Sequence, residues 1–181
     1  MGLADPVFAH QGPAGGFLTG LSHPVSGLDH VAAMVAVGLW GAQLGRPALW
    51  LLPVAFPMVM ALGAFLALLG LGLPGVEIGI AVSGIVLGAM VVLQARPPLP
   101  VALLLVSAFA VFHGHAHGTE LPANQSGLLY SAGFVMSTGL LHATGIAIGA
   151  IHVWKPGAVA VRVLGGVIMA GGAYFLWQAI A

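Results

Sequence analysis

The chain has 181 residues, of which 60% are hydrophobic and only 4% are charged, whereas roughly a quarter of the residues in soluble domains are charged. Because so few charged side chains cannot cover the surface of a water-soluble domain, most of this surface must face lipid. The formal net charge is zero, and the absence of a basic run excludes nucleic-acid binding. Cysteine is absent, so a metal site would have to use imidazole, carboxylate and backbone oxygen.

Apolar runs close to the roughly 20 residues that span a bilayer alternate with short stretches rich in charge, proline and glycine. We predict an all-α integral membrane protein, a six-transmembrane-helix bundle that forms a single transmembrane domain over residues 1–181, with a flexible N-terminus at residues 1–14. Glycine-rich stretches at residues 38–45 and 165–172 predict close helix packing. The predicted spans are residues 24–44, 48–71, 76–93, 99–113, 127–153 and 158–180.

The basic residues predict the orientation of these spans. Arg46 lies between the first and second spans, Arg96 between the third and fourth, and Lys155 and Arg162 between or just inside the fifth and sixth. Cytoplasmic loops carry the excess of lysine and arginine. We therefore expect this end of the bundle in the cytoplasm and both termini on the other side of the membrane.

The first polar motif is His-Pro-Val-Ser-Gly-Leu-Asp-His at residues 23–30. On a regular helix His23 and His30 share a face, whereas Asp29 points about 120° away. Pro24 and Gly27 predict a kinked or unwound first helix, in which both imidazoles, the carboxylate and free carbonyls could converge. An aspartate at membrane depth is costly without a cation or partner, which favours a functional role.

The second motif covers residues 113–120 and contains His113, His115, His117 and Glu120. If the segment is extended, its three histidines line one side; if it is helical, His113 and His117 pair at a spacing of four. Both geometries remain open from the sequence, and both offer two or more imidazoles to a divalent ion.

Topology places the two motifs at the same depth. The segment at 23–30 and Glu77 each lie at the outer start of a predicted span, the first and the third. The segment at 113–120 follows the fourth span, which ends on the same outer side. His142 lies about halfway along the fifth span, where it could form a deeper position on the same route.

Three segments resemble the HupE/UreJ family, small membrane permeases associated with nickel-dependent hydrogenases and ureases. The first is also similar to the His-x4-Asp-His signature of the broader nickel/cobalt transporters, but five residues separate His23 from Asp29, which favours the HupE/UreJ branch. The resemblance runs from residue 10 to the C-terminus. The segments are HPVSGLDHVAAMVAVGLWGAQLG at residues 23–45, FHGHAHGTELP at 112–122 and TGLLHATGI at 138–146.

The resemblance implies uptake of Ni²⁺ or Co²⁺, as the transported substrate, across a bacterial inner membrane for metalloenzyme maturation. In that membrane the distribution of basic residues predicts that both termini are periplasmic. It implies a multi-pass permease, with the lipid bilayer as its surroundings, and no organic cofactor. No nucleotide-binding motif occurs, so transport is either gradient-driven or passive. The predicted metal ligands are His23, Asp29, His30, His113, His117 and Glu120, with Glu77, His115 and His142 as additional metal or pathway residues.

An intramembrane zinc-dependent hydrolase is the alternative function. It would use histidines and Asp29 to hold zinc, with Glu120 or Glu77 as general base. No His-Glu-x-x-His pattern occurs, and one catalytic site requires fewer ligands than this chain offers. A structural membrane anchor would leave the clustered ionisable residues unexplained.

Overall fold

The computed structural model describes residues 13–120 and 126–181, which are almost entirely helical. The predicted flexible N-terminus, residues 1–14, lies outside the described residues except for Pro13 and Ala14, which begin the first helix. The elements are α1 (Pro13–Ser26), α2 (Leu28–Leu44), α3 (Ala48–Leu68), α4 (Val76–Leu93), α5 (Leu99–Thr119), α6 (Gly127–Gly149), the 3-10 helix η1 (Ala150–Val153) and α7 (Lys155–Ile180).

Apolar side chains cover the outside of the bundle as well as its core. Leu104 on α5 and Leu128 on α6 are 71% and 80% exposed, which only a lipid environment makes favourable. Five of the described helices are long and apolar enough to cross a membrane, or six if the bent pair α1 and α2 counts as one span. The predicted class, an all-α multi-pass membrane protein with a bent first helix, is confirmed.

The first span is broken rather than gently kinked. The axes of α1 and α2 differ by 82°, and Gly27 between them has extended backbone angles, φ −104° and ψ 118°. The first predicted span, residues 24–44, is therefore divided, because its first residues belong to α1 and the rest to α2. A side chain at residue 27 would crowd Asp29, because its Cβ would lie 2.8 Å from the Asp29 Oδ1 atom.

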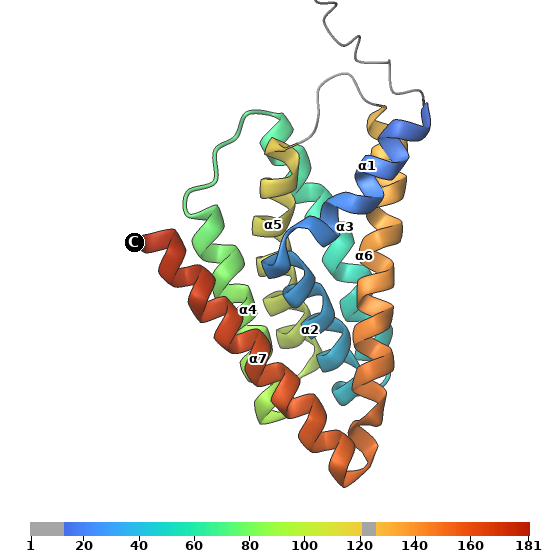
Figure 1. The fold of residues 1–181 in the computed structure, drawn as a ribbon, viewed down its shortest axis with the longest axis vertical. Helices are drawn as coiled ribbons and strands as arrows, with labels where there is room; N and C mark the ends of the chain where they lie inside the picture. The colour runs from blue at the N-terminus through green and yellow to red at the C-terminus, as the bar shows by residue number, and fades with distance from the viewer. Residues whose placement is uncertain (1–12, 121–125) are drawn as a thin grey trace, which may run out of the picture.

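Glycines allow the helices to approach closely in pairs. Gly38 of α2 and Gly145 of α6 face each other, and a Cβ on Gly145 would lie 3.0 Å from the Gly38 Cα atom. Gly172 of α7 packs in the same way against Gly84 of α4. The predicted close packing around Gly38 and Gly172 is confirmed. Figure 1 shows α2 in the middle of the bundle and α7 lying along α4 at its edge.

The connections sort the polar residues to opposite ends of the bundle. The α2–α3, α4–α5 and α6–α7 connections lie at one end, and the α3–α4 connection lies at the other (Figure 1). At the first end Arg96 and Lys155 line one hollow of about 460 Å³ together with the buried Gln43. At the other end α5 continues to Thr119, six residues beyond the predicted end of the fourth span, so its histidines are helical.

We predict that Gly145→Leu lowers the stability of the protein, because the added side chain would have to push α6 away from α2. Overpacking of this kind costs about 1–3 kcal/mol. The control is Gly139→Leu, since a Cβ at Gly139 meets nothing within 4 Å. Thermal unfolding in detergent should show a lowered midpoint for the first variant only. Equal midpoints would contradict the close contact between α2 and α6.

Candidate metal centre

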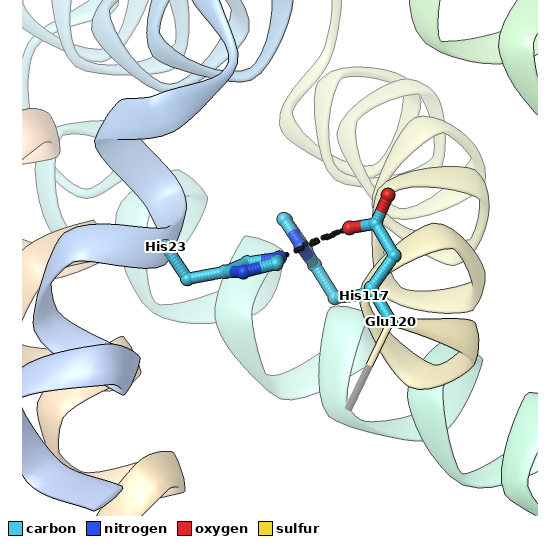
Figure 2. Close-up of side chains that lie close together, drawn as sticks. All are labelled: His23, His117 and Glu120. Carbon is cyan, nitrogen blue, oxygen red and sulfur yellow. Dashed lines mark hydrogen bonds and ion pairs between the residues drawn. The ribbon is translucent and has the colours of Figure 1, made fainter. Parts of the chain in front are cut away.

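The outermost polar group joins the end of α1 to the end of α5. His23 comes from the last turn of α1, and His117 and Glu120 come from the end of α5. The Nε2 atom of His23 lies 3.0 Å from Glu120 Oε2, and His117 Nδ1 lies 3.9 Å from the same oxygen. Figure 2 shows the side chain of His23 reaching from α1 towards Glu120, with His117 beside the line between them.

One ligand atom from each of His23, His117 and Glu120 lies within 4.8 Å of the others. Ligands at about 2 Å from a bound ion stand about 3–3.5 Å apart, so a small inward movement of these side chains would enclose a cation. Glu120 is 58% exposed and His117 only 6%. The group therefore has an open outer ligand and a buried inner one.

Helix ends add to the electrostatic preference for a cation at this place. The carbonyl end of a helix carries a partial negative charge, and both α1 and α5 end beside the group. The break at Gly27 thus creates a helix C-terminus within the first span. Asp29 lies in the first turn of α2, where a carboxylate is favoured by the positive end of the helix.

His30 connects this outer group to the interior. The Asp29 Oδ1 atom accepts a hydrogen bond from the His30 backbone N–H at 2.8 Å and lies 3.0 Å from His30 Nδ1. The His30 ring centroid lies 4.4 Å from that of His117 and 4.7 Å from that of His113. His30 is therefore the middle member of a row of three imidazoles.

The row continues towards the middle of the bundle through an aromatic ring. Phe56 on α3 lies between two fully buried histidines, with ring centroids 5.4 Å from His113 and 5.6 Å from His142. Neither ring nitrogen of His142 has a hydrogen-bond partner among the described residues. His142 is thus a buried imidazole without a polar partner in the described part of the chain, and it contacts the same Phe56 ring as His113 does.

Glu77 and the first motif line one hollow. It has a volume of about 180 Å³ and includes Asp29 and His30 in its wall. Glu77 is in the first turn of α4. Carboxylates therefore reach the hollow from three helices: Asp29 from α2, Glu77 from α4 and Glu120 from the end of α5. Such a concentration of acidic groups attracts a cation.

His115 faces elsewhere. Two residues along a helix correspond to a turn of about 200°, so His115 points away from the face that carries His113 and His117. Its Nε2 atom lies 2.8 Å from the Leu71 carbonyl oxygen in the α3–α4 connection. Because a carbonyl can only accept, His115 donates this bond and fastens α5 to that connection.

Two residues beside the histidines, Ser83 and Phe56, are not evident as site residues from the sequence. Ser83 lies fully buried on α4 with its Oγ atom 2.8 Å from His113 Nε2. Its one visible signal was a hydroxyl in the middle of an otherwise apolar span. Phe56 gave no signal of its own, because an aromatic residue in an apolar helix is ordinarily packing.

The fold and the polar group define a class, a multi-pass helical membrane protein that gathers histidines and carboxylates beside a broken first span. The chain belongs to the HupE/UreJ family, since the family model described as HupE / UreJ protein matches residues 1–175. Protein HupE from Rhizobium leguminosarum bv. viciae is 45% identical over 177 residues, which cover 96% of this chain and 93% of that protein. No solved structure matches this chain. The resemblance inferred from the three segments is confirmed.

We predict that His117→Ala weakens binding of Ni²⁺ to the purified protein by about tenfold or more, because even an outer-shell partner of a metal site is worth about 10–100-fold. His115→Ala, two residues away on the same helix, should bind almost as the wild type does. Equilibrium dialysis in detergent measures both. Equal losses in the two variants would contradict the assignment of faces on α5.

Proposed function

We propose that the protein is a permease that takes up Ni²⁺ or Co²⁺ across the bacterial inner membrane for metalloenzyme maturation. The observation that carries the proposal is the row of imidazole rings that leads inward from the exposed Glu120. Successive ring centroids lie 4.8 Å apart from His23 to His117, 4.4 Å from His117 to His30 and 4.7 Å from His30 to His113.

The ligand chemistry suits a transition metal. Imidazole nitrogen with carboxylate oxygen favours Ni²⁺, Co²⁺ and Zn²⁺ over Mg²⁺ and Ca²⁺, which prefer oxygen alone. In the proposed first step Glu120 and His23 replace part of the water shell of the arriving ion. His117, which is buried and adjacent to both, then draws the ion out of contact with solvent.

Neighbouring imidazoles allow the ion to move in short steps. His30 is close to both His117 and His113, so an ion can gain a new ligand before it loses an old one. Conduction requires this kind of multiple, individually weak binding. Phe56 then separates His113 from His142 and excludes a hydrated ion from the route between them.

The direction of uptake follows from the distribution of charge. Arg46 and Arg96 lie in the α2–α3 and α4–α5 connections and Lys155 begins α7, all at the end opposite the polar group. By the positive-inside rule this end is cytoplasmic. The polar group and both termini would then be periplasmic. A hydrolase would need one metal and one general base, whereas a row of sites along a path is what a transporter requires.

We predict that cells making the wild-type protein accumulate radioactive Ni²⁺ above empty cells. His142→Ala should lower the initial rate by about tenfold or more, since a barrier raised by about 1.4 kcal/mol costs a factor of ten. The control is His152→Ala, because His152 lies at the other end of the bundle, where its Nδ1 atom donates to the Gly149 carbonyl oxygen at 2.8 Å.

Immunoblotting of membranes should establish equal amounts of each variant. Full uptake by His142→Ala would remove the deeper position from the proposed route. A wild-type protein that gives no more uptake than empty cells would contradict the transport function itself.

A further inference from the structure

Positive charge gathers at the end of the bundle opposite the polar group, without a carboxylate beside it. Arg96 and Lys155 line the hollow of about 460 Å³ at this end. The acidic residues that the structure describes are Asp29, Glu77 and Glu120, which line a different hollow at the other end. Within the described ranges neither Arg96 nor Lys155 forms a salt bridge. The positive charge on the wall of this hollow is therefore not balanced by the described part of the chain.

A buried amide forms part of the same wall. Gln43 on α2 lines the hollow and is only 3% exposed. Its Nε2 atom donates to the Val91 carbonyl oxygen at 3.1 Å. Because a carbonyl can only accept, this bond fixes which side of the amide is oxygen. The Oε1 atom has no hydrogen-bond partner among the described residues, and a buried acceptor is costly unless another group donates to it.

Side chains occupy carbonyl groups at the end of α4, next to the hollow. The Arg162 Nε atom donates to the Val92 carbonyl oxygen at 2.9 Å, and Trp40 Nε1 donates to that of Ala95, also at 2.9 Å. Free carbonyls would disfavour an anion, because the C-terminal end of a helix carries partial negative charge. Lys155 begins α7, whose N-terminal end adds partial positive charge. The hollow thus offers donors and positive charge to a ligand, together with the amide oxygen of α2.

The hollow also borders the lipid-facing surface. Val153 and Trp154 in its wall are 79% and 57% exposed, and tryptophan is enriched at the depth of the lipid headgroups. Val159 and Val163, one and two turns along α7 from Lys155, are exposed as well. Residues four apart on a helix are neighbours on its surface, so these valines continue the charged wall as an apolar strip along α7. A ligand with an anionic head and apolar chains matches both parts, whereas a soluble anion would use only the first.

We propose that this hollow binds the headgroup of an anionic phospholipid that carries a free hydroxyl group, as phosphatidylglycerol does. The lipid phosphate accepts hydrogen bonds from Arg96 and Lys155, and the headgroup hydroxyl donates to Gln43 Oε1. Basic pockets between transmembrane helices at the cytoplasmic side recognise anionic headgroups by the same chemistry. The inference goes beyond the proposed function, because none of these residues belongs to the polar group or to the row of histidines.

The first test removes one positive charge from the wall. Native mass spectrometry of the purified full chain, titrated with dioleoylphosphatidylglycerol in detergent, measures the binding of the lipid. Arg96→Gln should weaken this binding by about fivefold or more. The control is Arg46→Gln, which removes the same charge at the same end from a residue that does not line the hollow. Equal affinities in the two variants would overturn the site.

The second test concerns the headgroup hydroxyl. Dioleoylphosphatidylmethanol has the same charge as phosphatidylglycerol but no free hydroxyl, so the wild type should bind it about fivefold more weakly. Gln43→Met should bind the two lipids equally. A wild type that does not distinguish them would remove the role of Gln43, and this comparison needs no variant to fold.

The third test separates a lipid from a soluble anion. We expect inorganic phosphate, added at the concentration of the lipid, to leave the bound phosphatidylglycerol in place, because phosphate has no chain to lie on the valines of α7. Displacement of the lipid by phosphate would contradict the lipid assignment. No metal is present in these titrations, so their outcome is independent of the proposed transport of Ni²⁺ or Co²⁺.

Discussion

The break at Gly27 is the constraint on which the polar centre depends. An unbroken helix over the first span would place His23 and His30 on one face and carry Asp29 away from them. The 82° turn instead ends α1 beside α5 and starts α2 within the same hollow. Burying a single ionisable side chain in a membrane is energetically unfavourable, and here the histidines and carboxylates interact with one another instead. A Cβ at residue 27 would crowd the Asp29 carboxylate and the His30 ring, so a larger residue there would displace these two side chains.

Helix pairing then sets the depth at which the inner histidines are buried. Glycines hold α3 against α5 and α2 against α6, so that Phe56 and His142 reach the same interior as the histidines of α5. The apolar surroundings of Phe56, His142 and the α5 histidines exclude water. The helices that carry these residues are held in place by close backbone contacts. The result is a series of neighbouring histidine side chains within a bundle whose outer surface is almost entirely apolar.

Much of this arrangement could be predicted from the sequence. Hydropathy alone predicts the long spans, and the pattern of proline and glycine at Pro24 and Gly27 predicts the break. Charge counting predicts that the polar motifs share one end. The sequence could not decide whether residues 113–120 are helical, because its glycines disfavour a helix while the apolar run before it favours one. It also left open that His115 faces away from His113 and His117. The hydrogen bond between His113 and Ser83 joins residues 30 positions apart. It depends on how α4 and α5 pack, which no local pattern encodes.

The most direct measurement of the central claim is transport by the purified protein in liposomes, with radioactive Ni²⁺ outside and His30→Ala as the variant. The account predicts that the wild type fills the liposomes faster than protein-free membranes do, that Co²⁺ competes and Mg²⁺ does not, and that His30→Ala abolishes the difference, because His30 joins the outer group to the interior. Wild-type liposomes that fill no faster than empty ones, or a His30→Ala protein that transports as the wild type does, would contradict it.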